Sequence, residues 1–479
     1  DAKALEMAET TLREMREGGI YDHVGFGFHR YSTDQKWLVP HFEKMLYDQA
    51  LLAMAYTEAF QATGKDEYRR TAEEIFAYVA RDMTDSGGGF FSAEDADSEG
   101  EEGLFYLWTA QQITDVLGEE DGKLWSDIYG VKAGGNFRDE ASGTSSARNI
   151  LHQRETLAES AKRLDTNEEA LRARLEAMRE KLLAVRSKRV RPLRDDKVLT
   201  DWNGLMISAY ARAAQAFDNP EYASAANRAA DFVLASLRGK DGRLLKRWRN
   251  GQAGHYATLE DYAFFIGGLL DLYEATFDPA RLAQALELAA QMDAHFAAPE
   301  GGYYLAPDDG EKLFVRSREI YDGAIPSGNS VAALDLLRLA RMTGDTSWEE
   351  KAHRLMDSFS IQAGGSPSAH TQLMLALDFA TGPSHEVVIA GEPAATDTKA
   401  MLAALRAPFL PNKVVLLRPP GEDAPIAKLA PYTAGQVSRD CRATAYVCRN
   451  FACALPTTDT AKMMELLKPE RLANTEHSP

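Results

Sequence analysis

The 479-residue sequence has few of the features that mark secreted or membrane proteins. It contains only three cysteines, Cys441, Cys448 and Cys453, and an odd, sparse count is typical of reduced thiols in a cytoplasmic protein. Their spacing forms neither a CxxC pair nor a zinc pattern, so we expect inert or structural thiols. No apolar run approaches the roughly 18 to 20 residues of a membrane span, and no signal sequence opens the chain. We therefore expect a cytoplasmic protein that does not contact a membrane.

Positive charge is also scarce, because 54 Lys and Arg residues stand against 72 Asp and Glu residues, giving a formal net charge of -18. Such a surface disfavours nucleic acid and anionic membranes as partners. The chain lacks a Gly-rich phosphate cradle, a Ser-centred nucleophile elbow and the HExxH metal motif. We therefore expect no cofactor and no metal ion.

The periodicity of apolar residues predicts helical hairpins. Residues 68–79, 222–233, 282–292 and 348–359 carry apolar side chains at steps of three and four, which is one face of a helix. Segments that are apolar nearly all round accompany them, over about 40–63, 199–217, 257–277 and 326–342. Helices of the second kind are buried on every side, as in the inner of two concentric rings. We predict a mainly α fold, a closed toroid of hairpins rather than an open solenoid.

The pattern changes after residue 384. Three short apolar runs, at 386–390, 413–417 and 443–448, predict strands, and two helices are expected at 398–405 and 460–467. We therefore expect a toroid over residues 1–384, with an insertion near 131–165, and a small α/β element over 385–479.

Polar side chains gather near the predicted starts of the inner helices, where the buried pattern does not predict them. In a toroid these starts face one opening, so we expect an acidic, aromatic-lined pocket for a small-molecule or saccharide ligand. Helix capping is the alternative, because Asp, Ser and Asn are favoured at helix starts. The candidates are Asp201, Trp202, Asn203, Glu260, Asp261, Tyr262, Asp322 and Asn329.

An acidic run at 92–102 lies between two aromatic segments, and strand, turn and strand is its expected shape. Crowded carboxylates raise one another's pKa, which can keep a general acid protonated near pH 7. We place Glu99, Glu101 and Glu102 at a solvated hairpin tip. Asp95 and Asp97 remain catalytic candidates.

The first inner helix is expected to open at Pro40, which would place His41, Lys44 and Asp48 on one face. A histidine near a helix N-terminus tends to stay neutral and can act as a base, although one that is merely hydrogen-bonded is the alternative. With His29 nearby, His41 forms a candidate pair of catalytic imidazoles. The neighbouring candidates for substrate binding are Arg30, Tyr31 and Asp48.

Several stretches are similar to the spermatogenesis-associated, thioredoxin-domain-containing protein family. They are GGIYDHVGFGFHRYSTDQKWLVPHFEKMLYDQALLA, GGGFFSAEDADSEGEEGLFYLWT, RPLRDDKVLTDWNGLMI, ATLEDYAFF, YDGAIPSGNSVAALDLLRLA and TAYVCRNFAC. The resemblance implies an (α/α)6 toroid, as in six-hairpin glycosidases and the N-acylglucosamine 2-epimerase fold, with a thioredoxin-like domain in front. Because the sequence opens within a predicted helix, we expect that front domain to be absent from it.

Three functions stay open, since a fold does not fix a reaction. Two carboxylates could hydrolyse a glycosidic bond, with a spacing of roughly 6.5 to 9.5 Å if inverting or about 5 Å if retaining; the candidates are Asp95, Asp97, Asp201 and Asp261. Two imidazoles, His29 and His41, could epimerise or isomerise a sugar. The third function is a non-catalytic sugar-binding or scaffold module, which predicts that Arg and Lys neutralise the acidic residues. The sequence leaves the oligomeric state undetermined.

Overall fold

The computed structural model describes residues 1–137 and 147–468, so part of the predicted insertion near 131–165 lies outside the described residues. The chain divides into two compact units, Asp1–Val198 and Leu199–Pro479, and passes from one to the other within β10 (Val198–Leu199). None of the described helices is both long enough and apolar enough to cross a bilayer.

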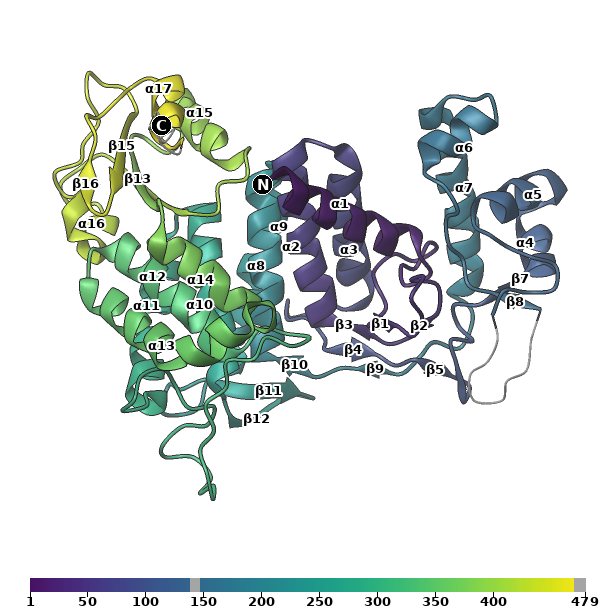
Figure 1. Cartoon of the computed structure of the whole chain (residues 1–479), viewed down its shortest axis with the longest axis horizontal. Coiled ribbons are helices and arrows are strands. Elements are labelled where there is room, and N and C mark those ends of the chain that lie inside the picture. The colour runs from purple at the N-terminus through teal and green to yellow at the C-terminus, as the bar shows by residue number, and fades with distance from the viewer. Residues whose placement is uncertain (138–146, 469–479) are drawn as a thin grey trace, which may run out of the picture. The chain divides into compact units, whose positions relative to one another are not determined.

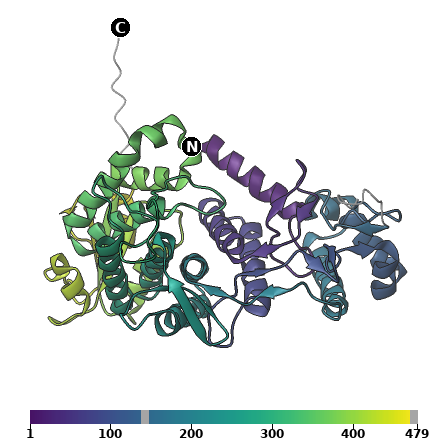
Figure 2. The same cartoon turned by 90° about the horizontal axis from the view of Figure 1, so that it is seen from below.

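The first unit begins with three long helices, α1 (Ala2–Glu17), α2 (Leu46–Thr63) and α3 (Asp66–Asp82). Figure 2 shows α1 in purple along its full length. Helices α2 and α3 form a hairpin, and Gly64 closes α2 with a left-handed backbone (φ 70°) that suits glycine. The predicted apolar face of α3 is buried, and the Tyr56 hydroxyl of α2 ties α1 down by donating to the Leu12 carbonyl at 2.7 Å.

Four further helices complete this unit: α4 (Ala110–Leu117), α5 (Glu119–Ile128), α6 (Leu157–Arg163) and α7 (Glu168–Arg186). They enclose an apolar cluster that includes Trp108, Trp125 and Met178. Two-residue strands connect them: β1 (Tyr31–Ser32), β2 (Pro40–His41), β3 (Lys44–Met45), β4 (Ala93–Glu94), β5 (Asp97–Ser98), β6 (Glu101–Glu102), β7 (Trp108–Thr109), β8 (Arg148–Asn149) and β9 (Arg194–Asp195).

The second unit consists of the predicted hairpins, whose inner helices are α8 (Thr200–Ala216), α10 (Leu259–Thr276) and α12 (Gly328–Thr343). Their outer partners are α9 (Pro220–Ser236), α11 (Pro279–Phe296) and α13 (Thr346–Gly365), and α14 (Thr371–Thr381) follows. The caps of α9 and α11 are as the sequence predicts, with Asn219 and Asp278 each accepting a backbone N–H. A hairpin of β11 (Leu245–Arg249) and β12 (Gln252–Tyr256) precedes α10.

The C-terminal element is a four-stranded sheet in the order β14-β13-β15-β16. Its strands are β13 (His385–Ala390), β14 (Lys413–Arg418), β15 (Thr444–Arg449) and β16 (Ala452–Cys453), and its helices are α15 (Thr396–Arg406), α16 (Ile426–Leu429) and α17 (Thr460–Leu466). Figure 1 shows this element in yellow above the green helices α10 to α14. Glu274 of α10 joins it to the helices by accepting the backbone N–H of Val415 at 2.8 Å.

The predicted fold class, mainly α with toroid-type helical hairpins and a small C-terminal α/β element, is confirmed. Two expectations are wrong. Helix α2 begins at Leu46 instead of Pro40, because residues 40–45 alternate between more and less buried side chains and pair as short strands. Cys448 and Cys453 are joined in a disulfide rather than reduced, and Cys441 is a free, exposed thiol.

Helices α8 and α10 approach each other closely at two glycines. A Cβ atom on Gly204 would lie 2.5 Å from the Phe264 carbonyl carbon, and one on Gly268 would lie 2.7 Å from the Gly204 oxygen. We expect Gly204→Ala to lower the free energy of unfolding by about 1–3 kcal/mol, measured by urea denaturation, because backbone cannot move aside as a side chain can. Gly364→Ala in α13 is the matched control, since its Cβ would meet no atom within 4 Å, and it should leave stability unchanged or raise it slightly. Equal stability of the two variants would contradict this account of the packing.

Candidate functional site

Asp48 is a half-buried residue whose carboxyl group has one enclosed oxygen without a partner. It lies in the first turn of α2, and its Oδ2 atom is enclosed but has no hydrogen-bond partner among the described residues. Burial raises the pKa of Asp48 to about 8; nearby Arg30 opposes this shift, and Glu43 adds to it. The group is therefore mostly protonated at neutral pH, and it can donate a proton or a hydrogen bond.

Charged and aromatic side chains surround this turn of α2. Arg30 donates from Nε to the Tyr47 hydroxyl at 3.1 Å and from a terminal nitrogen to Glu43 at 2.9 Å. The rings of Tyr31 and His41 lie 5.1 Å apart. The α2 cluster, as we call this group, consists of Arg30, Tyr31, His41, Glu43, Tyr47, Asp48 and Glu102. The structure thus brings four of the predicted site residues, Arg30, Tyr31, His41 and Asp48, to one place.

His41 lies on strand β2 between two carboxylates. Its Nδ1 atom is 2.7 Å from Glu102, and its Nε2 atom is 3.2 Å from Glu43. Glu43 lies on the same side as His41, because residues two apart on an extended chain share a side. The helix N-terminus argument does not apply to His41 either.

His29 occupies a different environment from His41. It is only 2% exposed, its Nδ1 atom is 3.0 Å from the Phe42 carbonyl, and its ring packs against Phe42 and Tyr106. Burial and the neighbouring Lys44 charge lower the pKa of His29 to about 3, so it is neutral. Phe42 and His41 are consecutive on an extended segment and point to opposite sides. The two imidazoles are therefore separated by the chain between them.

A buried ion triplet stabilises the same part of the first unit and was not predicted. Arg186 binds both oxygens of Asp22 at 2.7 and 2.8 Å, and Lys44 binds one of them at 2.8 Å. Although burial disfavours the charge, Arg186 and Lys44 hold the pKa of Asp22 well below its usual range. Because 164 residues separate Arg186 from Asp22, no local pattern indicates the pair.

Buried and exposed side chains alternate along the acidic run at 92–102. Asp95 and Asp97 are exposed, whereas Glu94 and Ser98 are buried. Glu94 accepts from the Tyr78 hydroxyl at 2.6 Å and binds Arg191 at 2.7 Å. The predicted catalytic carboxylates thus lie on the solvent side of their strands. The hairpin tip is solvated as expected, since Glu99 and Glu102 are exposed, although Glu101 pairs with Arg148 and Glu102 with His41.

In the second unit, Lys246 holds Asp201 and Asp261 together. Its Nζ atom lies 2.6 Å from Asp201 and 3.2 Å from Asp261, and we call these three residues the lysine cluster. Asp261 also accepts from the Asp201 backbone at 3.1 Å and completes a capping box with Thr258. Burial and the Asp201 charge raise the pKa of Asp261 to about 7. Although burial opposes it, the two carboxylates raise the pKa of Lys246.

Solvent reaches this cluster unevenly. The Asp261 side chain is fully buried and that of Asp201 is 5% exposed, whereas 29% of the Lys246 side chain is exposed. Trp202 and Glu260 are half-buried beside them, and burial raises the pKa of Glu260. A ligand here would meet Lys246, Trp202 and Glu260 before either aspartate.

The remaining predicted site residues tie loops to helices. Asn329 donates to the carbonyls of Tyr303 and Glu319, both at 2.9 Å, and accepts from the Tyr303 N–H at 2.8 Å. Asp322 accepts from the backbone N–H groups of Ser327 and Gln372. Asn203 donates to the Leu199 carbonyl, and Tyr262 contacts the Leu244 N–H and Gln291. Helix capping does not account for this group, since the N-cap of α12 is Ser327 instead of Asn329 and α8 has no side-chain cap.

One group among the described residues has the spacing of metal ligands: His295, Asp308 and Asp309. Arg243 already binds both oxygens of Asp309, at 2.7 and 2.5 Å, and so supplies the positive charge that a metal ion would bring. A separate cleft of about 220 Å³ in the first unit is lined by Arg16, Arg70 and Glu74 among others, and none of the predicted site residues lines it.

The chain is similar in sequence to longer known proteins. No protein-family model matches it. It is 38% identical to spermatogenesis-associated protein 20 of Homo sapiens and 37% identical to the protein of that name in Mus musculus, and the matches cover 98% and 97% of this chain. They cover 63% and 62% of the relatives, so the chain spans less than two thirds of their length. Among solved structures, a D-mannose isomerase is similar over 74% of this chain and 86% of its own, at 13% identity and a TM-score of 0.35, which is too low to support an inference about function.

Lys246 should be required for stability mainly at alkaline pH. We expect Lys246→Met to lower the free energy of unfolding by about 3 kcal/mol at pH 8, because two buried carboxylates then lose their counter-charge. The loss should shrink at pH 5, since the raised pKa of Asp261 lets it take up a proton below about pH 7.

Urea denaturation at the two pH values measures this difference. Lys240→Met is the control, because Lys240 is an exposed lysine nearby in the sequence. A loss of equal size at pH 5 and pH 8 would show that Lys246 acts through packing instead of charge.

Proposed function

We propose that the protein binds a polyhydroxylated, sugar-like small molecule at the α2 cluster, with Asp48 meeting a ligand hydroxyl group. The orphaned Oδ2 atom of Asp48 carries this proposal. A buried polar atom without a partner costs roughly 1–3 kcal/mol, and native proteins seldom leave one unless a water or ligand completes it. A ligand hydroxyl group would supply the missing bond.

The residues around Asp48 suit such a ligand. Tyr31 is 49% exposed and stacks with His41, so it offers a face for a sugar ring. Arg30, Glu43 and Glu102 provide donors and acceptors for hydroxyl groups. Aromatic faces beside charged groups are the usual composition of a site for small polar molecules.

The same residues support proton transfer, and we therefore propose a carbohydrate-active enzyme. Asp48 would act as the general acid, because its pKa of about 8 keeps it protonated near pH 7. Glu43, which lies beside His41, would act as the base, and His41 would orient the carboxylates of Glu43 and Glu102. Hydrolysis of a glycosidic bond and isomerisation of a sugar both need such an acid and base. We do not assign His29 a catalytic role in this proposal, because it is enclosed in the core.

A non-catalytic sugar-binding module is the second candidate function, and the lysine cluster favours it for the second unit. Neutralisation of the acidic residues by lysine is what a binding or scaffold role predicts, and Lys246 neutralises Asp201 and Asp261. Trp202 and Glu260 would then bind a saccharide without chemistry. Asp201 and Asp261 would be positioning residues rather than catalytic ones.

Two wider expectations also stay proposals. The resemblance of the sequence motifs suggests that a thioredoxin-like domain accounts for part of the extra length of the relatives. We further propose a cytoplasmic location, on the grounds of the sparse cysteines and the acidic composition.

A thermal-shift screen of mono- and oligosaccharides tests the binding proposal. At a concentration well above its dissociation constant, a bound sugar should raise the melting temperature of the wild type by a few degrees. Asp48→Asn should weaken that sugar at least about tenfold in a titration, because the amide replaces one of the two carboxyl oxygens with a nitrogen that cannot accept a hydrogen bond. Asp95→Asn, an exposed carboxylate, is the matched control and should bind as the wild type does. A screen without any shift, or unchanged affinity in Asp48→Asn, would refute the proposed site.

The sugar that binds can then separate the enzyme from the binding module. Incubation in deuterated water should yield either new reducing ends or deuterium on the sugar carbon, for hydrolysis or isomerisation respectively. Asp48→Asn should abolish either product. A sugar recovered unchanged from the wild type would favour the binding module.

A further inference from the structure

The hairpin of β15 and β16 turns through two residues, and the backbone conformation of the turn is unfavourable for one of them. Asn450 and Phe451 both have positive φ, 51° and 61°. A two-residue turn of this kind matches the twist of the strands, and Asn accepts it readily. Phe is a rare residue there, because its Cβ crowds the backbone. The turn therefore needs support beyond the backbone pairing of the two strands.

The first support is the disulfide across the hairpin. Cys448 and Cys453 occupy directly opposed positions of β15 and β16, and their sulfur atoms are bonded. Only five positions separate them in sequence, so the bond removes little chain entropy from the unfolded state. Its main effect is to fix the local conformation of the turn.

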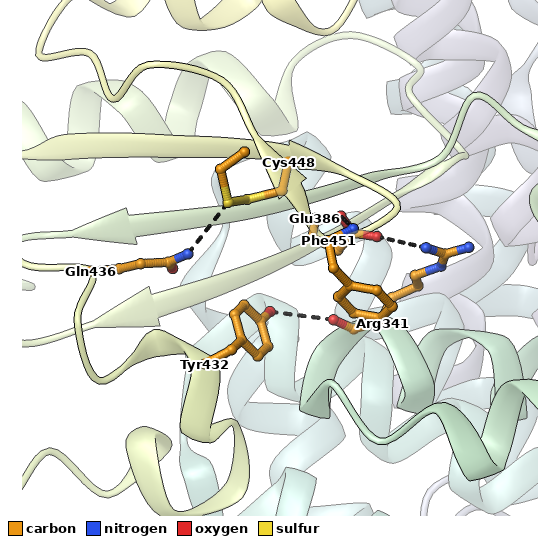
Figure 3. Close-up of a disulfide and its surroundings, with 7 residues drawn as sticks. Arg341, Glu386, Tyr432, Gln436, Cys448 and Phe451 are labelled. Carbon is orange, nitrogen blue, oxygen red and sulfur yellow. Dashed lines mark hydrogen bonds and ion pairs between the residues drawn. A yellow bond between two sulfur atoms is a disulfide. The ribbon is translucent and has the colours of Figure 1, made fainter.

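The second support is a buried ion pair beneath the turn. Arg341, from the last turn of α12, binds Glu386 of β13 at 3.0 Å, and both side chains are buried. The Phe451 N–H donates to the other Glu386 oxygen at 3.2 Å, and the Phe451 ring lies 5.1 Å from the Arg341 guanidinium. Figure 3 shows the Phe451 ring beside Arg341, and Tyr432 donates to the Arg341 carbonyl at 3.2 Å.

The two cysteines differ in their exposure to solvent. Cys448 is 2% exposed, whereas Cys453 is exposed on the edge strand. The side-chain nitrogen of Gln436 approaches the Cys453 sulfur at 3.7 Å. An incoming thiolate can therefore reach Cys453 and not Cys448, and exchange depends on which sulfur is accessible.

We propose that Cys448 and Cys453 form a thiol–disulfide exchange site for dithiols, and that reduction releases the Asn450–Phe451 turn from Arg341 and Glu386. A thiolate of the dithiol attacks the sulfur of Cys453, the bond between the two cysteines breaks, and Cys448 leaves and takes up a proton. The second thiol of the dithiol then attacks its own sulfur in the mixed disulfide and frees Cys453 as a thiol. Two electrons and two protons thus pass from the dithiol to the cysteine pair, and the dithiol becomes a disulfide.

Release of the turn changes the contact between helix α12 and the C-terminal element. With the bond broken, β16 is held to β15 by two residue pairs, and the Ala454 N–H that follows it donates to the Val447 carbonyl at 3.0 Å. The unfavourable φ of Phe451 can then relax, which withdraws the Phe451 N–H and ring from Glu386 and Arg341. The result is a reduced form with a mobile turn and an unchanged helical body. This inference does not depend on sugar binding at the α2 cluster.

Limited proteolysis of the whole chain tests the proposal with dithiothreitol as the dithiol. Chymotrypsin should cleave after Phe451 at least about tenfold faster in the reduced protein than in the oxidised one, with mass spectrometry following the peptide that ends at this residue. Cys453→Ser should be cleaved at the fast rate with or without dithiothreitol. Cys441→Ser, which removes the free exposed thiol, should behave as the wild type does.

Two results would overturn the inference. One is that Cys448 and Cys453 both react with iodoacetamide after equilibration with oxidised glutathione, which would mean that they do not form the bond. The other is that the oxidised, reduced and Cys453→Ser proteins are all cleaved after Phe451 at the same rate, which would mean that the bond does not control the turn. Circular dichroism should show the same helix content in every form, so that a folding defect is not mistaken for release of the turn.

Discussion

Compensation of buried charge determines how the polar residues of this chain are arranged. Removing an ion from water costs several kcal/mol, and only close counter-charges and donors offset that cost. Asp22 meets this requirement with Arg186 and Lys44, and Asp201 meets it with Lys246. The partners come from distant parts of the sequence, so each pair also joins separate elements. Most acidic residues inside the protein are consequently structural.

Asp48 and Asp335 are the informative exceptions, because burial raises the pKa of each to about 8 and each has an oxygen without a partner. Asp335 lies inside α12 with 2% exposure, against Gly267 of α10, where a ligand has no access. Asp48 is half-buried beside exposed groups of the α2 cluster. The same physical condition therefore has different consequences: Asp335 stays a neutral core group, whereas Asp48 is available to a ligand.

The sequence predicted features that depend on local spacing. Buried α10, the amphipathic face of α3 and the capped starts of α9 and α11 all follow from helical periodicity and capping. The closeness of Arg30, Tyr31 and His41 to Asp48 was also anticipated, although through a helix start at Pro40 that the structure places at Leu46. The burial of residues 40–45 alternates with a period of two, but the sequence does not show it, because Lys44 takes a buried position and Met45 a less buried one.

Features that depend on partners remote in sequence could not be predicted. Lys246 reaches Asp201 over 45 positions, and nothing in the local sequence of β11 marks that lysine. The burial of Glu94 instead of Asp95 depends on which side of a two-residue strand faces Arg191. The disulfide is different, since Cys448 and Cys453 are close in sequence. It was missed because the odd number of cysteines indicated reduced thiols, and the opposed positions of these two in a hairpin were not taken into account.

The state of the Asp48 carboxyl group tests the account most directly. Carbon-13 NMR of aspartate carboxyl groups, with Asp48 assigned by its absence in Asp48→Asn, can follow its titration in the protein without ligand. The account predicts a midpoint near pH 8, because the enclosed oxygen has no donor, and a shift of this signal when a sugar binds. A midpoint near the ordinary aspartate value of about 4 would contradict it, because a solvated Asp48 would have no need of a ligand hydroxyl group.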